Sequence, residues 1–219
     1  MKTKVLFIAF QFPPMGGPGV QRSTRFVKHL SDFGYDPLVL TIQEDDIVKM
    51  GSSIDQSLLN YIPENTEIVR VSSAIPFKLS AFLHKIKLYR LFWFFFYPAF
   101  WERSAMWPYT TFKTAEQLIK KHDIKLVYTS SGPFSSLILG AKLKRQLNIH
   151  WVADMRDPFT DAYAWSYPSK LHWYFCRFFE KKLLNRCDEL IVNTPEVKKL
   201  YLKRGIKSEP TITVITNGF

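Results

Sequence analysis

Three glycines lie in a short turn between a run of apolar residues and a stretch with helical spacing. Glycine lets a backbone turn tightly and approach a ligand closely, and the start of a helix presents free N–H groups to an anion. The turn reads GGPGVQR, which is neither a GxGxxG fingerprint nor a P-loop. A purely structural turn is the alternative. The candidate ligand-binding residues are Gly16, Gly17, Gly19, Val20, Gln21 and Arg22.

A charged cluster follows a later apolar run, where Asp154, Arg156 and Asp157 stand almost side by side. Two acids around a base can fix one another's charge state and orient donors towards a ligand. We take Arg156 and Asp157 as candidate binding residues. A buried ion pair that only fixes the loop is the alternative.

A second small-residue loop contains Ser130, Ser131 and Gly132 just before a predicted helix. This arrangement suits an anion or sugar hydroxyl groups, and serine that merely caps the helix is the alternative. The histidines show no metal-ligand spacing, and no Ser-His-Asp or Cys-His set is readable. We therefore expect neither a metal nor a bound cofactor, and we name no catalytic residue.

Alternating strands and helices must position these loops. Continuous apolar runs predict buried strands at residues 4–10, 37–41, 67–71, 125–129, 150–154, 189–193 and 211–215. Apolar spacing of three and four predicts helices at 20–33, 77–97, 110–121, 134–147 and 170–186, with another starting at Pro195. This order predicts one α/β domain over residues 1–219, with a Rossmann-like, doubly wound, mainly parallel sheet.

Residues 77–107 mix aromatic and basic side chains along a predicted helical segment. Interfacial helices combine such residues, and anionic headgroups attract the cations. The alternative is a helix that packs into the core or against another domain. The candidate membrane contacts are Lys78, Lys85, Lys87, Arg90 and Trp93.

The chain carries a formal net charge of +11, and the charge is regional. Residues 1–73 hold seven Lys/Arg and eight Asp/Glu, so the excess of cations lies entirely in residues 74–219. A basic region implies an anionic partner, and lipid headgroups, phosphorylated substrates and nucleic acids all qualify. No helix-turn-helix, zinc-finger or RNP-type pattern is present, so we do not expect nucleic-acid binding.

Cysteine usage and hydropathy indicate the compartment. Two cysteines fit a reducing environment. The first apolar run leads into Pro13-Pro14 without a cleavage pattern, and the longest charge-free aromatic run, eleven residues, is short of the roughly 20 that a spanning helix needs. We expect a cytoplasmic protein, peripheral at the inner face of the membrane if residues 77–107 bind lipid.

Four separated segments resemble the retaining GT-B glycosyltransferases of family 4. The turn GGPGVQR after the first strand is one of them, and DMRDPFT, which starts at Asp154, resembles the family's "DxRDPW" segment. ELIVNTP from Glu189 resembles the strand before the domain crossover. ITNGF from Ile215 resembles the "IPNG" segment leading into a second domain, which implies an interdomain hinge at Asn217 and Gly218. The resemblance covers nearly the whole chain.

The resemblance implies two Rossmann-like domains that face each other across a cleft. The N-terminal one binds mainly the acceptor, here a glycan or lipid-linked molecule in bacterial surface polysaccharide synthesis. The C-terminal one binds the nucleotide-sugar and carries an E-x7-E motif. We expect that second domain to be absent from these residues and the fragment to be inactive alone. Many family members carry a histidine in the loop at 129–135, and this sequence has none. A non-catalytic module that binds a membrane surface or another anion remains the alternative.

Overall fold

The computed structural model describes residues 2–88, 91, 102, 104–161, 167–207 and 211–217. Gly218 and two of the proposed membrane contacts, Arg90 and Trp93, lie outside these residues.

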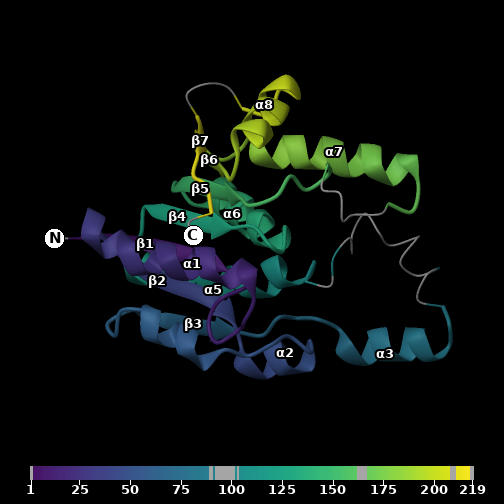
Figure 1. Ribbon diagram of the computed structural model, residues 1–219, viewed down its shortest axis with the longest axis horizontal. Coiled ribbons are helices and arrows are strands. Elements are labelled where there is room, and N and C mark those ends of the chain that lie inside the picture. The colour runs from purple at the N-terminus through teal and green to yellow at the C-terminus, as the bar shows by residue number, and fades with distance from the viewer. Residues whose placement is uncertain are drawn as a thin grey trace.

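Seven strands form one sheet, and every pairing between them is parallel. Their order is β3-β2-β1-β4-β5-β6-β7, so the chain begins in the middle, builds one side and then crosses back to build the other (Figure 1). This is the doubly wound Rossmann-like order. The strands are β1 Thr3–Ala9, β2 Tyr35–Ile42, β3 Ile68–Val71, β4 Leu126–Ser130, β5 His150–Met155, β6 Glu189–Val192 and β7 Ile212–Val214.

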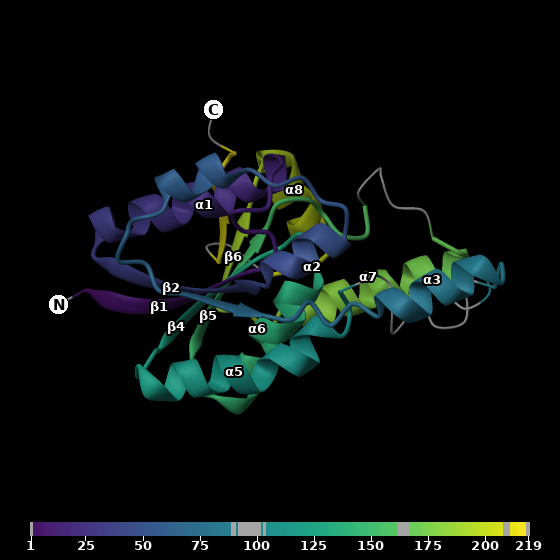
Figure 2. The same ribbon diagram turned by 90° about the horizontal axis from the view of Figure 1, so that it is seen from below.

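Helices cover both faces of the sheet. Helix α1 lies on one face, and α5 and α6 lie on the other (Figure 2). The helices are α1 Pro18–Leu30, α2 Glu44–Lys49, α3 Phe77–Lys85, α5 Trp107–Lys121, α6 Ser135–Gln146, α7 Lys170–Leu184 and α8 Pro195–Lys203. Short 3-10 helices are η1 Ser31–Phe33 and η2 Gln56–Tyr61.

Strand β1 shows why the apolar runs are continuous. Successive side chains point to opposite faces of a strand. Leu6 and Ile8 therefore pack into the cluster beneath α5 and α6, while Val5 and Phe7 pack into the cluster that includes Val27 of α1. Both faces of β1 are buried, as expected for a central strand of a parallel sheet.

The helix predicted at 77–97 ends earlier than its apolar spacing suggested. Helix α3 stops at Lys85, and Lys87 takes a left-handed backbone conformation with φ 58°. The N–H of Lys87 donates to the His84 carbonyl, and that of Leu88 donates to the Leu83 carbonyl. This pair of bonds is the Schellman ending of a helix, which usually places glycine where Lys87 stands. The prediction was wrong about the end because the sequence lacks that glycine.

Helix α2 was not predicted. It is only six residues long, and two of them are buried. Its sequence does carry the charge pattern of a helix, because Glu44, Asp45 and Asp46 occupy the first turn and Lys49 the last. Acids at the start and bases at the end of a helix complement its dipole.

Candidate functional site

The carboxyl ends of three neighbouring strands bring the predicted loops together. Ala9 of β1 pairs with Ser130 of β4, and Ser130 pairs with Asp154 of β5. The loops that follow these strands therefore start side by side at one edge of the sheet. Ligands of open α/β folds bind outside this edge.

A hollow of about 140 Å³ lies between the loops after β4 and β5. It is lined by Ser131, Gly132, Pro133, Phe134, Met155, Arg156, Asp157, Pro158 and Phe159. Four predicted binding residues meet there, namely Ser131, Gly132, Arg156 and Asp157. The glycine turn at 16–19 is not among the lining residues.

Arg156 ties three loops to one another at this edge. Its Nε donates to the Ser131 carbonyl at 2.5 Å, and its Nη2 donates to the Gln11 side-chain oxygen at 2.9 Å and the Gly132 carbonyl at 3.1 Å. Its Nη1 donates to the Gly19 carbonyl. Burial lowers the pKa of Arg156, and the charges of Asp154 and Asp157 partly offset that effect. Because the Arg156 side chain donates four hydrogen bonds to other residues of the chain, most of its N–H groups already have partners within the protein.

Two glycines are needed because Arg156 passes so close to them. A Cβ atom on Gly132 would collide with the Arg156 guanidinium, and Gly132 also has a φ of +99°, which side chains rarely adopt. A Cβ on Gly19 would collide with the Gln11 side-chain oxygen and would lie 2.8 Å from Arg156 Nη1. The glycines of the two loops thus make room for Arg156 and for the Gln11 side chain that it contacts, which the sequence pattern alone does not reveal.

Arg22 forms a buried ion pair with Asp154. Its Nε and Nη2 donate to the two carboxylate oxygens at 2.9 and 2.8 Å. Burial works to lower the pKa of Arg22, but the hydrogen bonds and charge of Asp154 outweigh it, and the pKa is raised. The Arg22 guanidinium therefore keeps its charge in this pair.

The remaining nitrogen of Arg22 holds the last described segment of the chain. Nη1 donates to the Ile215 carbonyl at 2.9 Å, the Thr216 carbonyl at 3.2 Å and the Asn217 side-chain oxygen at 3.2 Å. The predicted hinge residue Asn217 and the predicted site residue Arg22 are thus in direct contact.

Glu102 occupies the start of α6, where the sequence suggested an anion site. The Phe134 N–H donates to one Glu102 carboxylate oxygen at 3.0 Å, and the Ser135 N–H donates to the other. Ser131 accepts a hydrogen bond from the Arg156 N–H at 3.0 Å, and Ser130 is 3.4 Å from the Ser23 hydroxyl. The serines therefore hold the loop, and a carboxylate of the chain already occupies the helix start.

The rest of the glycine turn packs against the segment before η2. The Gly16 N–H donates to the Ser53 carbonyl at 2.8 Å. Gly17 precedes α1 with a φ of 106°. Val20 is buried, whereas the Gln21 side chain is exposed. Gly17 and Gln21 are therefore the candidate residues of this motif that are exposed to solvent.

Residues 19–219 match the sequence model of Glycosyltransferase Family 4. The chain belongs to glycosyltransferase family 4. The match confirms the resemblance to this family, and the family's N-terminal domain is the part that this chain represents.

Solved structures confirm the fold of this family 4 domain. Sucrose-phosphate synthase from Thermosynechococcus elongatus superposes with a TM-score of 0.59 and 15% identity, covering 100% of this chain and 49% of that one. A putative UDP-N-acetylglucosamine 2-epimerase from Listeria monocytogenes gives 0.55 and 13%, covering 98% and 45%. The chain thus spans about half the length of these proteins. A search of curated protein sequences gives no significant match.

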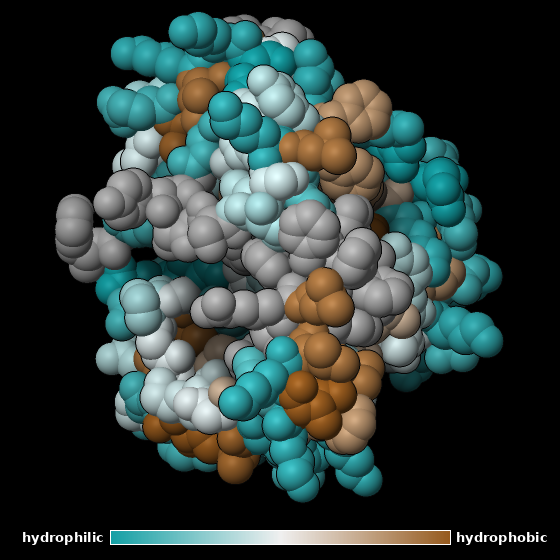
Figure 3. Space-filling view, turned by 90° about the vertical axis from the view of Figure 1, so that its right-hand side faces the viewer, coloured by the Kyte–Doolittle hydropathy of each residue, from teal (hydrophilic) through white to brown (hydrophobic). Residues whose placement is uncertain are grey.

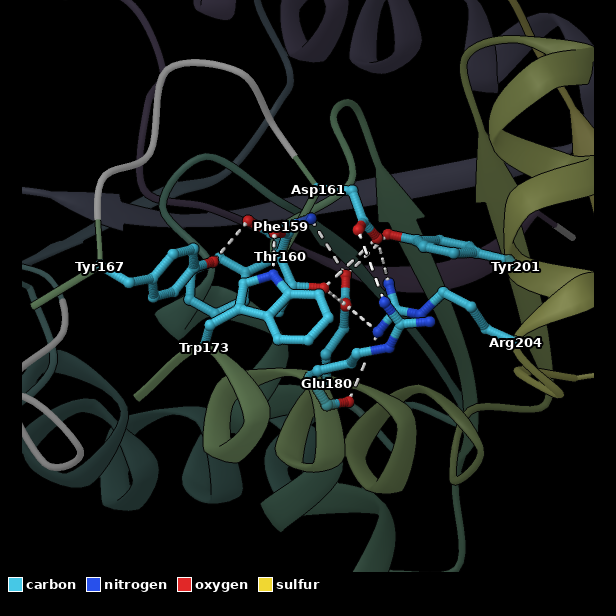
Figure 4. A network of polar contacts seen from close by, with 9 residues as sticks. Phe159, Thr160, Asp161, Tyr167, Trp173, Glu180, Tyr201 and Arg204 are labelled. Carbon is cyan, nitrogen blue, oxygen red and sulfur yellow. Dashed lines mark hydrogen bonds and ion pairs between the residues drawn. The ribbon is translucent and has the colours of Figure 1, made fainter. Parts of the chain in front are cut away.

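A second buried network in the family 4 domain centres on Glu180 of α7 (Figure 4). Its carboxylate accepts hydrogen bonds from the Phe159 N–H at 3.0 Å and the Tyr201 hydroxyl at 2.9 Å. It also pairs with Arg204 at 2.8 Å. Phe159 lines the hollow, so this network joins one wall of the hollow to α7 and to the end of α8. This network was not predicted from the sequence, although a single acid within the aromatic-rich helix α7 could have indicated it.

The predicted membrane contacts within the described residues are exposed. Lys78 and Lys85 lie in α3, and Lys87 follows it. Within the described residues, none of the helices combines the length and hydropathy needed to cross a bilayer.

Proposed function

We propose that this domain binds the acceptor of a retaining glycosyltransferase. The sugar comes from a nucleotide-sugar held by a second domain, and it passes to a glycan or lipid-linked acceptor. The family resemblance favours bacterial surface polysaccharide synthesis. The observation that carries the proposal is the hollow at the carboxyl ends of β4 and β5, within a chain of this family.

The walls of the hollow suit a sugar. Asp157 is exposed at its rim, and a carboxylate accepts hydrogen bonds from sugar hydroxyls. Phe134 and Phe159 stack on each other with ring centroids 4.1 Å apart, which gives the hollow an apolar wall. Ligand sites typically combine such apolar surface with a few fixed polar groups.

The contribution of this domain to the reaction is to hold the acceptor in place. Correct orientation of two reactants removes much of the entropic barrier to their reaction, and the rest depends on stabilising the leaving diphosphate. Arg156 fixes the loops around the hollow through four hydrogen bonds. It therefore acts as a positioning residue, and we assign no nucleophile to this domain.

Steady-state kinetics of the complete enzyme test this assignment. We expect Asp157→Ala to raise KM for the acceptor and to leave KM for the nucleotide-sugar unchanged, because the carboxylate faces the hollow of this domain alone. Asp32→Ala is the matched control, because it removes an exposed carboxylate in η1 at the opposite edge of the sheet. A rise confined to the KM of the nucleotide-sugar would overturn the proposal.

We also propose that the 219-residue chain does not transfer sugar alone, because the donor is bound elsewhere. The measurement is a steady-state assay with radiolabelled UDP- and GDP-sugars and the purified chain. Sugar transfer that co-purifies with the chain would contradict this proposal, because it would show that the chain itself contains the donor site.

A further inference from the structure

The outer face of α7 carries a stripe of large apolar side chains that no other part of the described chain covers. Leu171, Tyr174, Phe175 and Phe178 are 77%, 62%, 42% and 66% exposed. They are spaced by three and four residues, which places them on one face of a helix. An apolar stripe with this spacing normally faces a core, so its exposure indicates a missing partner.

The opposite face of α7 is firmly attached to the domain. Cys176, Leu183 and Leu184 are buried there, and Glu180 makes the ion pair with Arg204 described above. The stripe therefore cannot turn inward without breaking the buried network. It is a fixed surface feature of this helix.

Charge on α7 identifies the chemistry of the partner. Glu180 is the one acid between Lys170 and Leu184, and it is fully buried. Lys170, Lys181 and Lys182 are exposed, and Lys182 lies over the Phe178 ring at 5.9 Å from its centroid. The exposed surface of α7 thus combines large apolar groups with cations alone.

Helix α3 repeats this combination at the same end of the molecule. Leu79 and Phe82 are exposed, Lys78 and Lys85 are exposed beside them, and α3 contains no acid. Both helices extend past the carboxyl edge of the sheet, with α7 above α3 (Figure 1). Figure 3 shows the molecule from that end. Hydrophobic residues form one group in the upper part of the view and another in the lower part, each beside hydrophilic residues.

We propose that the exposed stripe of α7, together with α3, docks on an anionic lipid bilayer. Interfacial helices insert aromatic and leucine side chains below the headgroups while lysines contact anionic lipids. A second copy of the chain fits poorly, because the same cations would face each other across the interface. The inference goes beyond the proposed function, since lipid binding does not depend on sugar transfer.

Vesicle co-sedimentation of the 219-residue chain tests the proposal. We expect binding to vesicles of phosphatidylglycerol and phosphatidylcholine in equal parts, and much weaker binding to phosphatidylcholine alone. The double variant Leu171→Ser/Phe178→Ser should weaken binding roughly tenfold or more, because two large apolar groups no longer leave water. Lys170→Gln/Lys182→Gln should weaken binding to the anionic vesicles and reduce its dependence on salt.

Phe33→Ser is the matched control. Phe33 is 78% exposed, and it lies at the opposite edge of the sheet, where the Thr3 N–H donates to the Gly34 carbonyl. We expect native binding by this variant, and unchanged circular dichroism in all variants. The proposal is overturned if the chain does not co-sediment, if the α7 double variant binds like the native chain, or if neutral vesicles bind equally well. Dimerisation without lipid that the same double variant abolishes would assign the stripe to a second copy and also overturn it.

Discussion

At the scale of single residues, the ion pair of Arg22 and Asp154 is the most consequential contact of the site. We expect Arg22→Met to destabilise the chain by about 3–5 kcal/mol, because it leaves the buried Asp154 carboxylate without its partner. It should also release the Ile215–Asn217 segment. Urea unfolding measures the loss of stability, and amide hydrogen exchange at 215–217 measures the release.

Arg25→Met is the control for that prediction. Arg25 lies one turn further along α1 and is exposed, so its replacement should change stability by no more than about 0.5 kcal/mol. Equal losses of stability in the two variants would contradict the role that we assign to the ion pair.

Asp188 gives a prediction about pH. Burial alone would raise the pKa of Asp188, but hydrogen bonds from Lys144 and the Trp151 N–H outweigh it, and the pKa is lowered. A carboxyl group whose pKa is lower in the folded than in the unfolded chain stabilises the folded state, and this contribution is complete above the unfolded pKa of about 3.9. The contribution is lost as the pH falls through the pKa of the folded state. We expect Asp188→Asn to cost about 1–3 kcal/mol at pH 7, with the difference from the native chain narrowing below about pH 4.

Denaturant titrations across that pH range check the Asp188 prediction. Asp123→Asn is the control, because the Asp123 side chain is 84% exposed and its ion pair with Lys125 lies at the surface. A stability difference for Asp188→Asn that stays constant down to pH 2 would show that the carboxylate charge is not the cause.

Residue types predicted which loops meet at the carboxyl edge of the sheet, but they did not reveal what each side chain contacts. Asp154, Arg156 and the small residues of the loop after β4 were found because polar groups at strand ends meet in a parallel sheet. Arg22 was expected to offer free donors, and instead its partners lie more than 130 positions away. Glu102 at the start of α6 is a contact of the same kind. Long-range partners of this type depend on the assembled fold.

At the scale of elements, the end of α3 yields a prediction. Lys87 has a left-handed φ of 58°, a conformation that costs a residue with a Cβ atom roughly 1–2 kcal/mol and glycine much less. We expect Lys87→Gly to stabilise α3 by about 1 kcal/mol, seen as slower amide exchange between 81 and 85. Lys85→Gly, inside the helix, should destabilise α3 by about 1 kcal/mol. Faster exchange in both variants would contradict the Schellman ending.

Elements with strong periodicity were predicted well, and weak or short ones were not. All seven strands were found because each contains a run of apolar residues, which is buried in central strands such as β1 and only partly buried in the edge strands β3 and β7. Helix α2 was missed because six residues are too few to show a period. The single helix predicted at 77–97 is interrupted after Lys85 by the turn at Lys87, and residues 92–97 of that prediction lie outside the described part of the chain. Apolar spacing does not report a helix end that lacks glycine or proline.

At the scale of the whole molecule, the candidate site lies at the carboxyl edge of the sheet. The hollow and the ion pair of Arg22 with Asp154 lie at this edge, and helices α3 and α7 extend past it (Figures 1 and 2). The sequence predicted the order of strands and helices and the regional positive charge. It did not predict that the outer face of α7 is exposed, because the same spacing of apolar residues describes a helix packed on a core.

The central claim is that this domain recognises the acceptor. Ligand-detected NMR of the 219-residue chain, with a panel of bacterial surface oligosaccharides and with UDP- and GDP-sugars, tests it most directly. The account predicts saturation transfer to at least one oligosaccharide, weakened by Asp157→Ala, and none to the nucleotide-sugars. Nucleotide-sugar binding that Asp157→Ala abolishes, with no oligosaccharide bound, would contradict it.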